Sequence, residues 1–175
     1  MNLHFMLAAS ALFAAAACGQ PSTPAAAQPA ATAGAASFTD AEISAGLRAA
    51  QLTPAPRGQV VNACNDRVTP NIYAADLGGA LSRAMVITVG GGPSLYTCYG
   101  DGVLGLVLKQ EGAGFRVVFS NQGGILFSMP ATHNGVHDLM WGGPGSTMPT
   151  FRWNGTEYEP GRSVPDSEPT LRSFD

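Results

Sequence analysis

The chain has 175 residues and a formal net charge of -3, and only 12% of its residues are charged. Because no basic surface is indicated, the chain is not expected to bind nucleic acid or to reach anionic lipid through its charge. Its 22 glycines and 13 prolines, beside a 45% share of hydrophobic residues, favour an all-β domain with tight turns over a disordered chain.

Residues 1–18 have the pattern of an export signal. Residues 1–17 are apolar, too few for a comfortable membrane span, and end in small residues as a signal peptide does. The segment AAAC at 15–18 resembles a bacterial lipobox, in which the cysteine is lipidated and becomes the first residue of the mature protein. The resemblance implies a lipid on Cys18, and Gly19, where inner-membrane lipoproteins usually carry Asp, favours periplasmic anchoring to the outer membrane. The alternative is simple cleavage, which gives a soluble periplasmic or secreted protein.

Residues 19–37 contain no charge and no large apolar group, so they cannot bury enough surface to offset the entropy of ordering. They are therefore expected to be a flexible Ala/Pro tether. The folded β domain is expected at 38–159. Residues 160–175 contain three prolines and no hydrophobic periodicity, which predicts a disordered tail.

Residues 38–52 are the clearest helix in the sequence. Thr39 and Glu42 have the spacing of a capping box. Ile43 and Leu47 recur one helical turn apart, and Pro54 is a stop signal shortly after the segment.

After the helix, short apolar or aromatic runs alternate with turn residues, which predicts strands. The predicted strands are residues 59–64, 72–77, 84–89, 103–109, 115–120, 125–129, 137–141 and 150–153. A hairpin turn is expected at 111–114, and Asn154-Gly155 is a further strong turn signal.

Two cysteines remain for the folded part, Cys64 and Cys98. Export implies an oxidising compartment, so a disulfide between them is the simplest expectation. Such a bond would contribute about 3–4 kcal/mol in the chain-entropy treatment. A reactive thiol is the alternative, but no His or Lys lies near either cysteine in the sequence to lower a thiol pKa.

Two segments, residues 76–100 and 133–155, echo each other. Each has a glycine turn, a Met-containing apolar strand, a Gly/Pro/Ser corner, an aromatic strand and a final glycine. Self-similarity of this kind indicates a duplicated supersecondary unit.

A series of motifs extends over roughly residues 58–158. In chain order they are Cys64, Asp76-Leu77, Cys98, the apolar hairpin at 115–119, Asn134-Gly135 with Asp138, the GGPG corner at 142–145, and residues 151–155 with Tyr158. In this order the chain resembles a group of exported proteobacterial proteins, and its repeat is similar to the FG-GAP/VCBS repeats of β-propeller blades. The resemblance implies a mainly β fold: a small antiparallel β domain of two propeller-blade-like repeats, with one N-terminal helix.

In the repeats that this chain resembles, Asp and Asn side chains of the loop hold calcium. The first loop here keeps only Asp76 and has Arg83 where an acid is usual, while the second keeps Asn134 and Asp138. One or two carboxylates do not hold calcium tightly, so no metal or cofactor is expected. The loop frame can persist because Asn134 and Gly135 tolerate a positive φ, and because Asp138 can accept hydrogen bonds from backbone N–H groups.

The sequence His133, His137, Asp138 is the one candidate for chemistry. On a helix, histidines four residues apart could share a zinc ion, but the Asn134-Gly135 pair between them predicts a turn and hence two surface histidines. Neither a GxSxG elbow nor a phosphate-loop GK[ST] ending occurs in the sequence.

Four aromatic residues are a candidate binding surface: Trp141, Phe151, Trp153 and Tyr158. The period-two spacing of Phe151 and Trp153 fits equally the core face of a sheet, which is the alternative interpretation.

Two classes of function remain. The first is a non-catalytic binding or structural domain at the cell envelope, whose partner is an envelope protein or a glycan and whose membrane contact is the lipid anchor alone. The second is a periplasmic hydrolase or metal-binding protein that uses His133, His137 and Asp138. These classes differ in whether the three side chains converge in a cavity.

Overall fold

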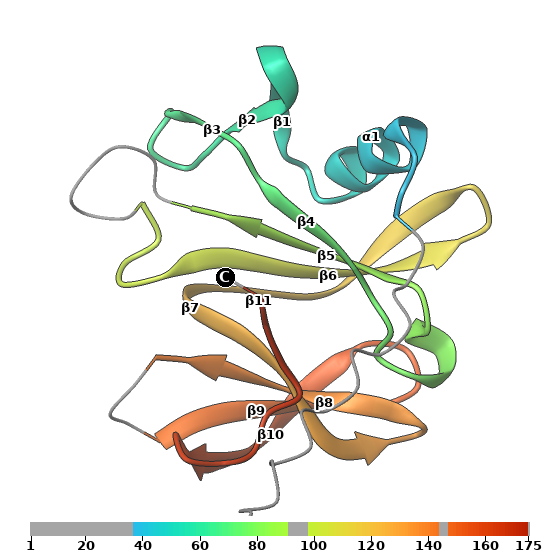
Figure 1. The fold of residues 1–175 in the computed structure, drawn as a ribbon, viewed down its shortest axis with the longest axis vertical. Helices are drawn as coiled ribbons and strands as arrows, with labels where there is room; N and C mark the ends of the chain where they lie inside the picture. The colour runs from blue at the N-terminus through green and yellow to red at the C-terminus, as the bar shows by residue number, and fades with distance from the viewer. Residues whose placement is uncertain (1–36, 91–97, 144–146, 175) are drawn as a thin grey trace, which may run out of the picture. The chain divides into compact units, whose positions relative to one another are not determined.

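The computed structural model describes residues 37–90, 98–143 and 147–174, which belong to the second of two units of the chain, Ala33–Asp175. The predicted export signal with Cys18, and the predicted tether apart from Ser37, lie outside the described residues. The elements in chain order are α1 (Asp40–Ala49), β1 (Thr53–Ala55), the 3-10 helix η1 (Pro56–Gly58), β2 (Gln59–Val61), β3 (Arg67–Val68), β4 (Asn71–Ala75), the 3-10 helix η2 (Gly79–Leu81), β5 (Ala84–Val89), β6 (Val103–Glu111), β7 (Gly114–His133), β8 (Val136–Gly142), β9 (Thr147–Trp153), β10 (Tyr158–Pro165) and β11 (Arg172–Phe174) (Figure 1). The predicted mainly β class with antiparallel strands and one N-terminal helix is confirmed.

Helix α1 forms where the sequence predicts it, with shorter ends. The Thr39 hydroxyl accepts a hydrogen bond from the Glu42 backbone N–H at 3.3 Å, and the Glu42 carboxylate accepts one from the Thr39 N–H at 2.8 Å. This capping box satisfies two of the donors that a helix start leaves free. Gly46 faces the sheet, where an added Cβ would collide with the Met85 side chain. None of the helices in the described ranges is long and apolar enough to cross a membrane.

The main sheet is an antiparallel meander in the order β10-β9-β8-β7-β6-β5-β4, and β1, β2 and β3 form a small sheet of their own. Strand β7 has 20 residues and joins the two parts of the meander: its first half pairs with β6 and its second half with β8 (Figure 1). The sequence predicted two strands here, 115–120 and 125–129. They are one strand because Gly123, with φ of 84°, forms a bulge that bends the strand without ending it.

Hydrophobic side chains form three clusters on the two faces of this bent sheet. The first lies between the two parts of the meander and includes Val86, Val107 and Leu139. The second lies between α1 and the opposite face of β5 and β6, and includes Ile87. Because β5 is covered on both faces, all six of its residues are buried. The third cluster, a small one around Met140, lies on the far side of β7–β10.

The hairpin between β7 and β8 turns at Asn134 and Gly135, whose φ angles are 51° and 75°. Two successive positive φ values are the signature of the two-residue type I′ turn that the Asn-Gly pair favours. This turn meets the corresponding turn of the first echoed segment: the Leu77 carbonyl accepts the His137 N–H at 2.7 Å. Gly78, with φ of 83°, approaches so closely that an added Cβ would lie 2.6 Å from the Gly135 carbonyl oxygen. The two echoed segments therefore begin at turns that pack against each other.

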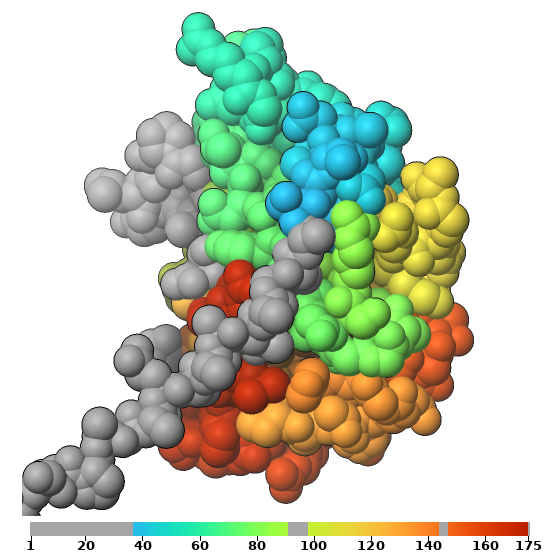
Figure 2. Space-filling view, turned by 45° about the vertical axis from the view of Figure 1, so that its right-hand side comes forward, coloured from blue at the N-terminus to red at the C-terminus, as the bar shows by residue number. Residues whose placement is uncertain are grey.

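The predicted disordered tail at 160–175 is wrong for the residues that the structure describes. Residues up to Pro165 extend β10 along β9, and β11 pairs with β7 through Phe174, which is 1% exposed. Figure 2 shows the red C-terminal residues lying against the orange residues that precede them. Prolines fit here because β10 is the last strand of the sheet order, so a missing N–H on its outer edge breaks no ladder.

Candidate functional site

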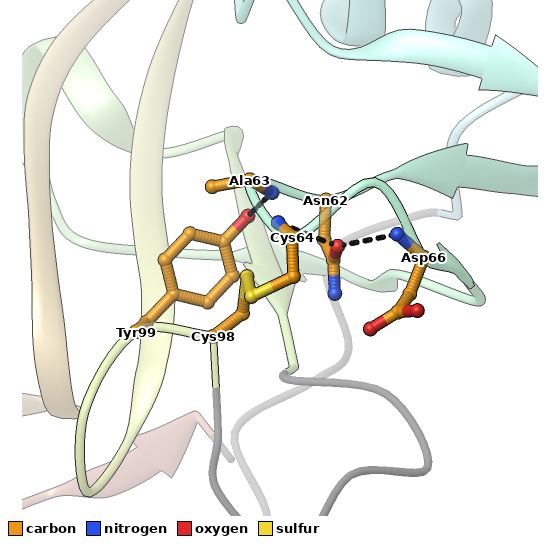
Figure 3. The surroundings of a disulfide bond; sticks show 6 residues. All are labelled: Asn62, Ala63, Cys64, Asp66, Cys98 and Tyr99. Atoms are coloured by element: carbon orange, nitrogen blue, oxygen red, sulfur yellow. Dashed lines mark hydrogen bonds between the residues drawn. A yellow bond between two sulfur atoms is a disulfide. The ribbon is translucent and has the colours of Figure 1, made fainter.

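The predicted disulfide between Cys64 and Cys98 is confirmed, with the two Cα atoms 5.6 Å apart. Figure 3 shows how the surrounding groups hold the loop: the Asn62 side-chain oxygen accepts the N–H groups of Cys64 and Asp66 at 3.0 and 2.8 Å. The Tyr99 hydroxyl oxygen accepts the Ala63 N–H at 3.2 Å. Both sulfur atoms are used in the bond, so the alternative of a reactive thiol is wrong.

The aromatic residues predicted as a candidate binding surface lie in the core instead. Trp141, Trp153 and Tyr158 are 5%, 2% and 8% exposed, and Phe151 packs against them. Their rings gather around Phe119, whose ring centroid lies 4.9 Å from that of Phe151. Alternation along β9 directs Phe151 and Trp153 to the inner face, so the core interpretation is correct and the surface hypothesis is wrong.

The residues of the degenerate loops do not converge on one point. Asp76 accepts the Gly78 N–H at 2.9 Å, which is a local Asx turn, and the Asn134 side chain donates to the Trp153 carbonyl at 2.8 Å. Asp138, predicted to accept backbone N–H groups, pairs with His133. Across residues 37–90, 98–143 and 147–174, no group of three His, Cys, Asp or Glu side chains is placed to hold a metal ion.

Arg83, which replaces the acidic residue expected in a calcium loop, connects α1 to the segment before β5 through an ion pair with Glu42. Its guanidinium contacts the Glu42 carboxylate at 2.8 Å and lies over the Phe38 ring, 4.4 Å from the centroid. The hydrogen bond from Arg83, followed by the one from the Thr39 backbone, lowers the pKa of Glu42 from 4.5 to about 2.

A cavity of about 370 Å³ opens on the outer face of the second part of the sheet, and we name it the β7–β10 cavity. Its lining residues come from four neighbouring strands and from the β10–β11 connection: Met129, Ala131, His133, Asp138, Thr150, Arg152, Arg162, Val164 and Glu168. Those on one strand are two residues apart, because alternate residues of a strand share a face. Met129 and Val164, both buried, belong to the third hydrophobic cluster and form an apolar part of the lining.

Within this cavity, His133 and Asp138 form a pair, with Nδ1 and Oδ1 2.7 Å apart. They are diagonal neighbours across the β7–β8 hairpin, close enough for long side chains to meet. The Asp138 side chain is 7% exposed and that of His133 is 45% exposed, so the histidine covers a buried carboxylate. The prediction of His133 as a surface residue is therefore confirmed, and the structure adds a partner, Asp138, that the sequence analysis did not assign to it.

His137 does not join this pair. It precedes Asp138 on β8 and therefore faces the opposite side of the sheet. Its backbone carbonyl accepts the Tyr158 hydroxyl at 2.9 Å, and its Nδ1 is buried without a hydrogen-bond partner in the described part of the chain. Burial, and secondarily the Asp138 charge, raise the pKa of Tyr158, so this phenol stays protonated and keeps donating.

Two arginines, Arg152 and Arg162, are among the residues that line the cavity. Arg162 lies 3.9 Å from the Glu168 carboxylate, and its side chain is 80% exposed. The Arg152 side chain makes neither a hydrogen bond nor an ion pair with any residue inside the described ranges. The Thr150 hydroxyl donates a hydrogen bond to the Arg162 backbone carbonyl at 2.6 Å, and this bond connects β9 to β10.

Thr150, Arg152, Arg162 and Glu168 escaped the sequence analysis. The first two carried a usable signal, because they alternate with Phe151 and Trp153: once those aromatics are assigned to the core, their neighbours must face outward. Arg162 and Glu168 carried none, because they lie in the segment predicted to be a tail.

Comparison with family models, with curated proteins and with solved structures gives no match. The chemistry of the β7–β10 cavity is therefore the basis for interpreting the site. An unpaired guanidinium can bind an anion, and a His–Asp pair can orient an imidazole for proton transfer.

Proposed function

We propose that this protein is exported to the cell envelope, is anchored to the outer membrane through a lipid on Cys18, and acts there as a non-catalytic binding domain. The Cys64–Cys98 disulfide supports export, because such bonds persist in oxidising compartments and are rare in the cytosol. Residues 1–18, which resemble an export signal, support the same cellular location.

The observation that carries the binding role is the composition of the β7–β10 cavity. It places charged, hydrogen-bonding and apolar groups around one hollow of a size that suits a small ligand. Thr150 carries the one hydroxyl of its described lining, and that hydroxyl donates to the Arg162 carbonyl rather than to His133. A binding site without an activated nucleophile is the simplest description of this arrangement.

Export is tested by expressing the full chain in a Gram-negative host, labelling with a fatty-acid analogue and separating the membranes. The wild type should carry the label in the outer membrane. Cys18→Ser should lose the label, whereas the matched control Cys64→Ser should keep it. A wild type that stays unlabelled in the cytoplasm would contradict the proposal.

A second candidate function, a periplasmic hydrolase, is favoured by the His133–Asp138 pair itself. Here Asp138 would orient the imidazole, which would take a proton from a water molecule that attacks the substrate. The test is hydrolysis of p-nitrophenyl esters and glycosides. Turnover by the wild type that is lost in His133→Ala and kept in His137→Ala would favour the hydrolase over the binding domain.

A further inference from the structure

Arg152 is the feature of the β7–β10 cavity that most clearly points to a ligand. Its guanidinium is charged at any physiological pH, lines the cavity, and has no anionic partner within the described ranges. Gly161 makes room for it: an added Cβ there would lie 3.4 Å from Arg152 Cγ and 2.6 Å from the Thr150 hydroxyl oxygen. The bulge of β10 around Gly161 therefore leaves space for the side chains of Thr150 and Arg152, the two β9 residues that line the cavity.

The charges around Arg152 limit the charge of the ligand. Arg162 is offset by Glu168 at 3.9 Å, and Asp138 is covered by His133 at 2.7 Å. Among the residues that line it, the cavity therefore holds one uncompensated positive charge when His133 is protonated and a balanced set when it is neutral; Glu159, opposite Arg152 on β10, is not one of the lining residues. A dianion such as phosphate would meet Asp138 and Glu168 without enough positive charge to offset both. A single negative charge fits better.

The apolar part of the lining indicates what the anion is attached to. Met129 and Val164 are 4% and 3% exposed, and they pack with Met140 and Met148 in one cluster. Methionine side chains are flexible and adapt to the shape of an apolar group. Because these side chains are nearly buried, the apolar area that they present to the cavity is small, and a short hydrocarbon segment beside an anionic group is enough to cover it while the anion reaches Arg152.

We infer that the β7–β10 cavity binds small molecules or chain ends that carry a carboxylate next to an apolar group, with the carboxylate on Arg152. A carboxylate matches the fork of a guanidinium through two parallel hydrogen bonds and brings a single charge. The inference rests on the proposed binding function and specifies its ligand class. It assigns the recognition to Arg152 and the apolar contact to Met129 and Val164.

The test uses three probes of similar size: butyrate, its neutral analogue butyramide, and the more highly charged butyl phosphate. Each is titrated into the ¹⁵N-labelled full chain, with the disulfide intact, while amide shifts are followed by NMR. Butyrate should shift amides of residues 129–133, 150–152 and 162–168 and bind about tenfold or more tightly than butyramide, because the charge-assisted bonds are lost in the amide. Butyl phosphate should bind more weakly than butyrate.

Variants separate recognition from general charge effects. Arg152→Gln should weaken butyrate binding about tenfold or more while its spectrum stays that of the folded protein, because the residue is exposed. Arg67→Gln, at an exposed arginine on β3 away from the cavity, is the matched control and should bind as the wild type does.

Three results would overturn the inference: equal binding of butyrate and butyramide, tighter binding of butyl phosphate, or unchanged binding in Arg152→Gln. None of them bears on the envelope location, which is determined from lipid labelling and membrane separation. Conversely, a cytoplasmic location would refute the proposed export and leave the titration result as it stands.

Discussion

Gly78→Ala should destabilise the domain strongly, because the change acts on the contact between the two turns. Gly78 has φ of 83° and ψ of 165°, a backbone region that is essentially restricted to glycine, where an alanine costs about 1–3 kcal/mol of backbone strain. The added Cβ would also lie 2.6 Å from the Gly135 carbonyl oxygen, a backbone atom fixed in its own turn. Forcing these groups apart adds roughly 1–3 kcal/mol, as overpacking does elsewhere. The expected loss in free energy of unfolding is therefore about 2–6 kcal/mol in total.

Gly58→Ala is the matched control, because Gly58 has φ of 73° and an added Cβ there would meet no atom within 4 Å. It should lose only the strain, about 1–2 kcal/mol. Denaturant unfolding of both variants, monitored by tryptophan fluorescence, gives the two values. If Gly78→Ala were no more destabilised than Gly58→Ala, the close approach of the two turns would not exist and the packing between the echoed segments would be wrong.

Three further predictions concern His133, Arg83 and calcium. His133→Ala should lower the free energy of unfolding by about 1–3 kcal/mol, because it leaves the buried Asp138 carboxylate without its partner; an unchanged denaturation midpoint would refute this pair. Arg83→Gln removes the largest cause of the lowered Glu42 pKa. The stabilisation that this carboxylate provides is fully present above pH 4.5 and lost as the pH falls to about 2, so the stability gap between wild type and variant should close over that range in pH-dependent denaturation. Calcium at millimolar concentration should shift the melting temperature by less than about 5 °C relative to chelator, and a larger shift would show that the loops bind the ion.

Local signals in the sequence were sufficient for several elements. The Thr39–Glu42 spacing marked the helix start, the run Ala84–Val89 marked β5, and the Asn134-Gly135 pair marked the type I′ turn. Each of these depends on residues that are close in the chain, so the physical cause can be recognised from a few neighbouring residues.

Other elements depended on pairing partners far away in the chain. The sequence predicted separate strands at 115–120 and 125–129, but pairing with β6 on one side and β8 on the other makes them one strand, β7. The prolines after Tyr158 indicated a mobile end, but they fall on an edge strand, where proline is tolerated. Phe174, which anchors the end of the chain against β7, has no nearby residue that would predict its burial.

The candidate site was predictable only in part for the same reason. The sequence singled out His133, His137 and Asp138 as residues that could converge in a cavity, and two of these three meet there. Arg152 could have been placed from strand alternation alone. Arg162 enters the cavity only because β10 pairs with β9, a contact that requires the tail to fold back.

The most direct test of an exported, anchored and disulfide-bonded binding domain is non-reducing intact-mass spectrometry of the protein purified from cell envelopes. The expected mass is that of the chain from Cys18 onward, with acyl chains added at Cys18 and with a pair of hydrogens missing at Cys64 and Cys98. A chain that retains residues 1–17, carries no lipid and has free thiols at all three cysteines would contradict the proposed export, the lipid anchor and the disulfide.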